Sequence, residues 1–246
     1  MEKIRVTIWN EFYHERKDGE AKELYPEGIH EFLKKALAAD DLEITTAWLD
    51  KDEEHGLSKE VLNNTDVLVW WGHMKHGDVK DEVVERVCKR VNRNGMGLVV
   101  LHSGHHSKVF KKLMGTSCSL MWREIGEHGR VWCVDPTHPI AQGVPQSFVL
   151  EKEECYCERF QIPTPDELVY VTWWEGGEIF RGGVTYKRGY GKIFYFHPGH
   201  ETVPSYYNEN VIKVIGNGIR WAKPIAQIPD EPGDWKNPEE DIPRRD

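Results

Sequence analysis

The stretch GLVVLHSGHHSKVF, residues 97–110, decides the fold. It starts as a continuously apolar strand and then changes into three histidines around one glycine, before the helix-like residues SKVFKKLM follow at 107–114. A strand without polar alternation indicates burial on both faces, as in a parallel sheet covered by helices. A chain that turns sharply from strand to helix while presenting His102 at its tip needs small residues beside that tip, and Gly104 fits this need.

The same alternation of strands and helices surrounds this stretch in the first half of the chain. Apolar runs predict strands at 4–9, 42–49, 66–71 and 96–102, and helical spacing predicts helices at 26–39, 58–64 and 78–95. The polar residues between the first strand and the first helix fit neither period and predict a loop. Such βαβ units predict an α/β fold with a doubly wound, mostly parallel sheet and flanking helices.

The second half of the chain has a different pattern of predicted elements. After about residue 116 it is rich in strands, with hairpin signals at 176–177 and 187–191, which predict an antiparallel β extension packed on the parallel core or extending it. A closing helix is expected at 206–222. We therefore expect one domain over residues 1–223 and a proline-rich C-terminal arm over 224–246.

Composition excludes several classes of partner. The 246 residues carry a formal net charge of −9 without a basic cluster, so nucleic acid is not an expected partner. No apolar run approaches the ~20 residues of a membrane span, which excludes a membrane partner and predicts a cytoplasmic protein. No nucleotide cofactor is expected. Five cysteines are an odd number, and no disulfide framework is predicted.

Histidines follow three of the predicted strands. In sequence order they are His73 and His76, then His102, His105 and His106, and finally His197 and His200. Because the carboxyl ends of parallel strands line one crevice, we expect these side chains to meet there.

Two of these segments resemble class I glutamine amidotransferases. VVLHSGHH is similar to their strand followed by Cys-x-Gly-x-Gln, and YFHPGHE is similar to their segment with a catalytic His and Glu. The resemblance implies an amidotransferase-like fold with flavodoxin-like layering, and catalytic roles for His197 and for Glu201. Here His102 replaces the cysteine and His106 the glutamine, which excludes thioester chemistry. Two residues separate Pro198 from Glu201, a departure from the family's His-Pro-Glu.

The whole chain from about residue 3 to 222 resembles the ThuA-like, trehalose-utilisation family. The similar features are WWGH at 70–73, LHSGHHS at 101–107, THPIAQGVP at 137–145 and FHPGHE at 196–201. This resemblance implies a link to disaccharide catabolism, with a small carbohydrate substrate of the keto-sugar type supplied by a partner oxidoreductase.

Three interpretations of the histidines stay open. In the first, zinc or another divalent metal is bound by His73, His102, His106 and His197 and assists carbonyl chemistry. In the second, His102 and His197 act without metal as general acid and base, which would make the chain an isomerase, lyase or hydrolase of keto-glycosides. In the third, the chain is a non-catalytic sugar-binding or regulatory module on the same scaffold.

Every one of these interpretations needs a sugar pocket near the strand ends. The expected substrate-binding residues are Asn10, Glu11, Trp71, Gly72, Ser103 and Trp174. Adjacent tryptophans on a strand point to opposite faces, so one of each pair belongs to the core or an interface. The ten tryptophans and the C-terminal arm also suggest a homo-oligomer.

Overall fold

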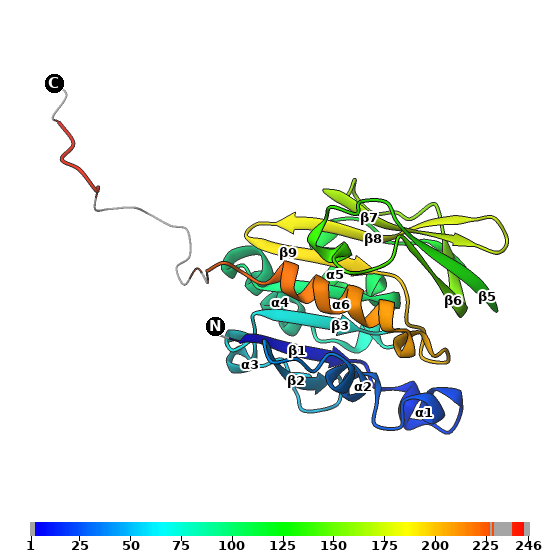
Figure 1. Ribbon diagram of the computed structural model, residues 1–246. Coiled ribbons are helices and arrows are strands. Elements are labelled where there is room, and N and C mark those ends of the chain that lie inside the picture. The colour runs from blue at the N-terminus through cyan, green and yellow to red at the C-terminus, as the bar shows by residue number, and fades with distance from the viewer. Residues whose placement is uncertain (1–2, 227, 229–237, 244–246) are drawn as a thin grey trace.

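One mixed sheet organises the molecule (Figure 1). The computed structural model describes residues 3–226, 228 and 238–243, and within them the sheet has nine strands in the order β2-β1-β3-β4-β9-β8-β7-β5-β6. The strands are β1 Ile4–Asn10, β2 Leu42–Trp48, β3 Val67–Trp71, β4 Gly97–Leu101, β5 Met121–Cys133, β6 Ser147–Cys157, β7 Glu167–Trp174, β8 Ile179–Arg188 and β9 Gly191–Phe196. The predicted α/β class is confirmed, and the second half extends the parallel core as part of the same sheet.

The parallel half of the sheet aligns four strand ends. β1 pairs in parallel with β2 and β3, β3 with β4, and β4 with β9. The register places Asn10 opposite Trp71, Trp71 opposite Leu101, and Leu101 opposite Phe196. The residues that follow these positions are therefore delivered side by side at one edge, as the topology of parallel sheets requires.

Helices cover both faces of this parallel half. They are α1 Glu20–Leu24, α2 Ile29–Ala36, α3 Lys59–Asn63, α4 Asp81–Asn94, α5 Lys108–Met114 and α6 Glu209–Ala222. Figure 1 shows α6 in front of the sheet and α4 and α5 behind it. Val67 and Val69 of β3 join the core on the α6 side, whereas Leu68 and Trp70 join the core on the α4 side. Burial on both faces explains why the strand is continuously apolar.

The structure differs from the sequence-based expectations in two places. The predicted loop after β1 contains a 3-10 helix, His14–Arg16, and α1, whose five residues bury only Ala21 and are too few to show a period. α6 starts at Glu209 with Asn208 as its N-cap, because a separate 3-10 turn occupies 205–207. The predicted arm 224–246 lies largely outside the described residues.

Two predicted exclusions concern the described part of the chain. None of its helices is long and apolar enough to cross a bilayer. The five cysteines, Cys88, Cys118, Cys133, Cys155 and Cys157, are all free thiols.

Candidate functional site

His102 occupies a strained elbow between β4 and α5. Its φ of +48° lies in the left-handed region, which is costly for a residue with a Cβ. Gly104 was predicted to allow the sharp turn, but it does so for a different physical reason, since its own φ is not positive. A Cβ on Gly104 would lie 2.8 Å from Val100 Cγ1 and 3.2 Å from the Trp70 carbonyl oxygen. Glycine is needed here for close packing on β3, while His102 itself takes the strained turn.

The ring of His102 is fully buried and held at both nitrogens. Nδ1 lies 3.1 Å from the His197 carbonyl oxygen, to which it donates, so Nε2 carries the lone pair of the neutral imidazole. Nε2 accepts the Tyr156 hydroxyl at 3.2 Å and lies 3.1 Å from Glu154 Oε2, although the contact with Glu154 lacks hydrogen-bond geometry. The His197 ring in turn donates from Nε2 to the Glu154 carbonyl oxygen at 3.1 Å. The ends of β4 and β9 thus fix this part of β6.

Burial favours the uncharged form of both His102 and Glu154. Burial, followed by the nearby charge of His73, lowers the pKa of His102 to about 3. Burial raises the pKa of Glu154. Glu154 thus has a raised pKa and an Oε2 atom that no hydrogen bond occupies, which are the properties of a candidate general acid.

A cavity of about 500 Å³ opens beside this pair. Its walls are formed by His73, Met74, His76, Ser103, His105, His106, Ser119, Leu120, Trp122, Glu124, Glu154 and Tyr156. Glu154 faces the cavity, and His102 lies behind it, outside the lining. Trp122 and Met74 are 65% and 62% exposed, so they form an apolar rim. This volume lies in the range of sites for small organic ligands. A larger hollow of about 1050 Å³ runs along α4 and contains none of the strand-end histidines.

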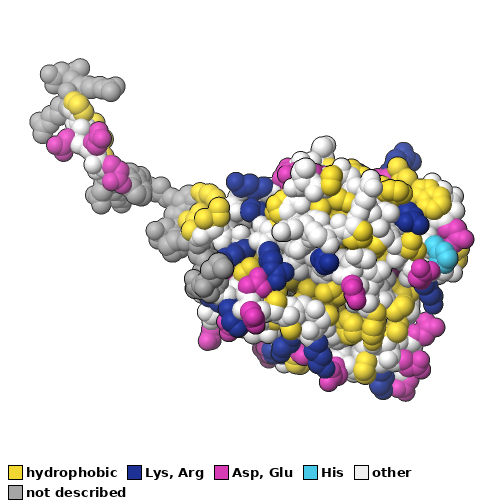
Figure 2. All heavy atoms as spheres, viewed as in Figure 1, with side chains coloured by type: hydrophobic (Ala, Val, Ile, Leu, Met, Phe, Trp, Pro, Cys, Tyr) yellow, Lys and Arg dark blue, Asp and Glu magenta, His cyan; other side chains and the backbone are white. Residues whose placement is uncertain are grey.

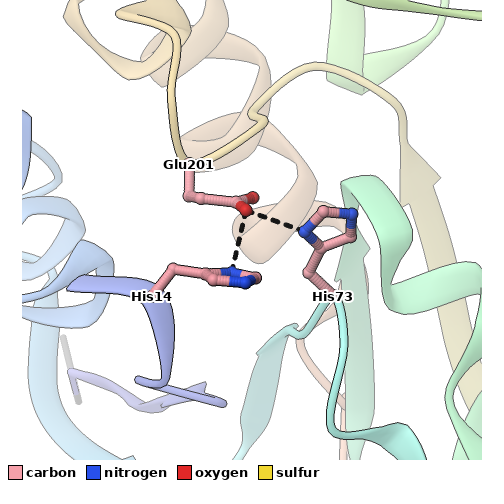
Figure 3. A group of neighbouring side chains, drawn as sticks. All are labelled: His14, His73 and Glu201. Atoms are coloured by element: carbon pink, nitrogen blue, oxygen red, sulfur yellow. Dashed lines mark hydrogen bonds and ion pairs between the residues drawn. The ribbon is translucent and has the colours of Figure 1, made fainter. Parts of the chain in front are cut away.

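Glu201 organises a second polar cluster next to the cavity (Figure 3). Its Oε1 lies 2.8 Å from Nδ1 of His73 and 2.8 Å from Nδ1 of His14, although the His14 contact lacks hydrogen-bond geometry. Burial acts against the charge of Glu201, but the contacts with the two imidazoles outweigh it and hold the pKa of Glu201 well below its usual range. Burial likewise acts to lower the pKa of His73, and the contact with Glu201 reverses this and raises it.

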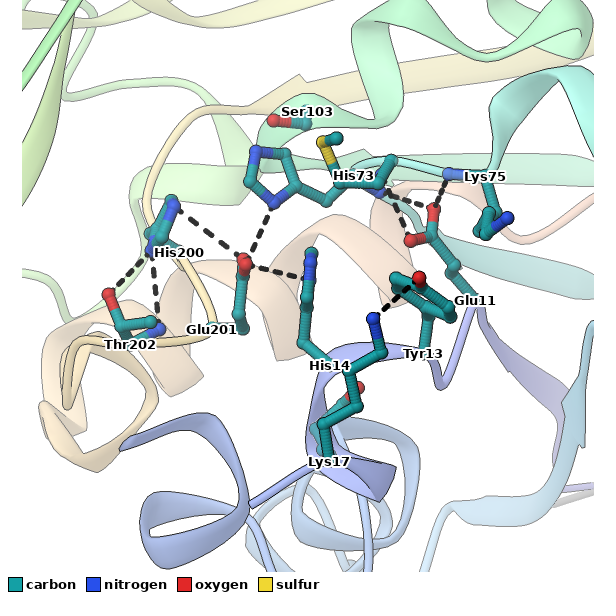
Figure 4. Close-up of polar contacts among 12 residues, drawn as sticks. Glu11, Tyr13, His14, Lys17, His73, Lys75, Ser103, His200, Glu201 and Thr202 are labelled. Atoms are coloured by element: carbon teal, nitrogen blue, oxygen red, sulfur yellow. Dashed lines mark hydrogen bonds and ion pairs between the residues drawn. The ribbon is translucent and has the colours of Figure 1, made fainter. Parts of the chain in front are cut away.

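His200 faces the same carboxylate from the other side (Figure 4). Its Nε2 lies 3.6 Å from Glu201 Oε2 and 3.9 Å from Glu154 Oε2, and it has no hydrogen-bond partner. Burial lowers the pKa of His200 to about 4. His200 therefore lies between the two carboxylates as a neutral ring.

Glu11, expected to bind substrate, instead holds the loop that carries His73. Its carboxylate accepts the backbone N–H groups of His73, Met74 and Lys75 at 2.8, 2.9 and 2.7 Å (Figure 4). The three charge-assisted hydrogen bonds from residues 73–75 occupy both carboxylate oxygens of this buried side chain.

Asn10, the last residue of β1, has a similar supporting role. Its amide nitrogen lies 2.7 Å from Glu15 Oε1 and 3.0 Å from His30 Nδ1, and its oxygen accepts the Phe12 N–H at 2.9 Å. These contacts fix the loop that carries His14, and they leave Asn10 no side-chain atom facing the cavity.

Among the other expected substrate contacts, only Ser103 lines the cavity. Its hydroxyl is hydrogen-bonded to that of Tyr156. Trp71 and Trp174 are buried core residues whose indole N–H groups donate to the carbonyl oxygens of Gly199, at 2.9 Å, and Tyr156, at 2.6 Å. Gly72 is buried and does not line the cavity.

The structure does not bring the four expected metal ligands together. The ring centroids of His73 and His102 are 5.9 Å apart, and those of His102 and His197 are 6.1 Å apart. His106 is exposed and packs 6.2 Å from His76. Little histidine surface is visible on the face of the molecule drawn in Figure 2.

Three other groups among the described residues have metal-ligand spacing. They are His14–His73–Glu201, His73–Glu154–His200 and Glu127–Cys155–Glu178. In the third group, Arg123 forms ion pairs with both carboxylates, which already neutralises them. Glu201 belongs to the first group and contacts His14 and His73. The amidotransferase resemblance gave catalytic roles to both Glu201 and His197, but these contacts do not include His197.

Sequence reasoning missed several residues that shape the site. His14, Trp122, Glu154 and Tyr156 were not among the expected functional residues, whereas His200 was expected at the crevice without an assigned role. The sequence contains no signal for Glu154, because it ends the charged run 151–154, and only the structure shows that Glu153 and Glu154 are buried whereas Glu151 and Lys152 are exposed. Glu153 is used structurally, since it accepts the backbone N–H groups of Gly199 and His200 at 2.7 and 3.3 Å.

Comparisons with known proteins agree with this architecture. A family model described as ThuA, trehalose utilisation, matches residues 5–222. A ThuA-like protein from Parabacteroides merdae superposes with a TM-score of 0.66 at 15% identity, covering 93% of this chain and 94% of that chain. A Salmonella typhimurium protein described as cytoplasmic gives 0.59 at 11% identity, covering 89% and 100%. A Thermoplasma acidophilum protein described as part of a GMP synthase gives 0.52 at 12% identity, covering 89% and 94%. No curated protein matches the chain by sequence.

Proposed function

The chain belongs to the ThuA family of trehalose utilisation, and from this premise we propose that it is an enzyme that transfers a proton to a keto-disaccharide in the cavity beside β4. The observation that carries the proposal is the position of the Glu154 carboxyl group, which is buried at the wall of a cavity of about 500 Å³ with an Oε2 atom that has no hydrogen-bond partner and lies 3.1 Å from His102 Nε2. A buried carboxyl group with a raised pKa is the usual form of a general acid at neutral pH.

The proposed step assigns a role to each member of the pair. The Glu154 carboxyl group donates its proton to the glycosidic oxygen as the C–O bond breaks, and the bonding electrons leave with that oxygen. His102 lies 3.1 Å from the carboxyl group on the side away from the cavity and positions it. Glu154 then regains a proton either from the water that completes hydrolysis or from the sugar carbon next to the keto group, which completes elimination.

The cavity rim supports a sugar as the substrate class. The exposed face of Trp122 offers an apolar surface to the C–H groups of a pyranose ring, and Ser103, Glu124 and His73 supply polar groups for its hydroxyls. A separate oxidoreductase would supply the keto group by oxidising a sugar hydroxyl. We also propose a cytoplasmic location, as described for the similar Salmonella protein.

A direct assay tests the proposal. The purified chain is incubated with 3-keto-trehalose, with trehalose as the unoxidised control, and release of the free monosaccharide is followed. Release from the keto-sugar alone supports an enzyme of this class. Binding of the keto-sugar without release, seen by calorimetry, would favour the alternative of a non-catalytic sugar-binding module.

A further inference from the structure

Three side chains from three strand ends converge on one point outside the proton-transfer pair. His14 follows β1, His73 follows β3 and Glu201 follows β9. One ligand atom from each lies within 4.8 Å of the other two. In Figure 3 the two imidazoles flank the Glu201 carboxylate, which is only 4% exposed.

Two atoms of this group are buried without a hydrogen-bond partner. They are His14 Nδ1, which points toward Glu201 Oε1 without hydrogen-bond geometry, and Glu201 Oε2. Buried polar atoms are nearly always satisfied, so two such atoms in one cluster need an explanation. A cation between them satisfies both.

We propose that His14, His73 and Glu201 bind one divalent transition-metal ion, with zinc as the ion that fits best. Two imidazole nitrogens and one carboxylate oxygen form a common ligand set of catalytic zinc sites, which keep a fourth position open for water or substrate. The side chains of His14 and His73 are 26% and 21% exposed, so solvent reaches that position.

The surrounding residues hold the ligands in place. Glu11 fixes the backbone of His73 through three hydrogen bonds, and Asn10 fixes the start of the loop that carries His14. Such supporting contacts orient metal ligands and tune their affinity. Because His73 also lines the cavity, a metal ion here lies next to the proposed substrate site.

The alternative group with His200 fits a metal less well. His200 Nδ1 accepts the Thr202 backbone N–H at 3.2 Å, so the neutral ring carries its proton on Nε2. That proton faces Glu201 Oε2 at 3.6 Å and occupies the nitrogen that a metal would need. His200 therefore lies next to the proposed site without a hydrogen bond to its carboxylate.

Zinc binding by the protein itself tests this site. The full chain is treated with a chelator, dialysed, and titrated with Zn²⁺ against a chromogenic chelator, together with His14→Ala and Glu201→Gln. His128→Ala is the matched control, because His128 is 60% exposed and lies on β5 outside the group. Circular dichroism confirms that each variant folds, and the Zn²⁺-dependent rise in the Tm of the wild type gives a second readout.

We expect one zinc ion per chain in the wild type and in His128→Ala, and affinity at least about 100-fold weaker in His14→Ala and Glu201→Gln. No stoichiometric zinc in the wild type, or unchanged affinity in both ligand variants, would overturn the site. The result is independent of the proposed sugar chemistry. Zinc binding without turnover would support the metal site and contradict the proposed enzyme activity, whereas turnover without zinc binding would support the enzyme activity and contradict the metal site.

Discussion

The Nε2 atom of His102 lies 3.1 Å from Oε2 of Glu154, and the other ring nitrogen of His102 donates to the carbonyl oxygen of His197. Because Nδ1 carries the imidazole proton, Nε2 accepts the Tyr156 hydroxyl at 3.2 Å, and its contact with Glu154 leaves Oε2 without a hydrogen-bond partner. The elbow after β4, which carries a cysteine nucleophile in glutamine amidotransferases, thus places a neutral imidazole beside a carboxyl group on β6.

Replacing His102 removes the partner of the Glu154 carboxyl group. Asparagine tolerates the positive φ of +48° at this position, so His102→Asn is the substitution that preserves the backbone best. We expect kcat on the keto-disaccharide to fall about 100-fold, with KM changed little, since His102 does not line the cavity. Steady-state kinetics measure both values, and an unchanged kcat would remove His102 from the mechanism.

Trp122 is predicted to bind the sugar without stabilising the fold. It is 65% exposed at the cavity rim, so Trp122→Ala should leave the Tm nearly unchanged and raise KM about tenfold, which corresponds to about 1.4 kcal/mol of binding. Trp173→Ala is the control, because Trp173 is 46% exposed and does not line the cavity. Equal KM values for the two variants would argue against stacking on Trp122.

Glu11 is predicted to hold its loop together without contacting substrate. Glu11→Ala leaves three backbone N–H groups of the 73–75 loop without their acceptor, and we expect the free energy of unfolding to fall by about 3 kcal/mol. Hydrogen exchange should accelerate at residues 73–75 in particular. Unchanged exchange there, combined with a raised KM, would restore the sequence-based role of Glu11 as a substrate ligand.

His30 should make the protein less stable in acid. Burial lowers its pKa to about 4 in the folded state, against about 6.5 in the unfolded chain. Between these values the unfolded chain binds the extra proton, so the contribution is complete above pH 6.5 and is lost as the pH falls toward 4. The shift corresponds to at most about 3 kcal/mol.

A buried, uncharged replacement isolates this effect. In His30→Gln the free energy of unfolding should depend less steeply on pH between 6.5 and 4 than in the wild type, whatever the change in absolute stability. Urea unfolding at several pH values measures both slopes. Identical slopes would show that His30 does not titrate as its burial predicts.

The parallel core was predictable because its signals are local. Continuously apolar runs identify β3 and β4, and the alternation of strands with helices gives the layering. The register that places Trp71 beside Leu101, and Leu101 beside Phe196, then brings the strand-end histidines to one edge. The five-residue α1 escaped prediction because a helix of this length has no readable period.

The sequence predicted the sheet edge where the candidate site lies, but it did not predict the contacts between the side chains. Topology gives the edge where residues meet, whereas the partner of each side chain depends on packing that no spacing reveals. His102 and His73 lie at the site as expected, but Glu154 comes from the antiparallel half, whose strands could not be ordered from the sequence. The saturated contacts of Glu11 likewise depend on a loop conformation that has no sequence pattern.

The most direct test of the account is the turnover of 3-keto-trehalose by Glu154→Gln beside Glu151→Gln. Both substitutions remove a carboxylate from β6, but Glu151 is 83% exposed and Glu154 faces the cavity. We predict that Glu154→Gln lowers kcat about 100- to 10,000-fold, and that Glu151→Gln has wild-type turnover. Equal turnover by the two folded variants would contradict a general acid at Glu154.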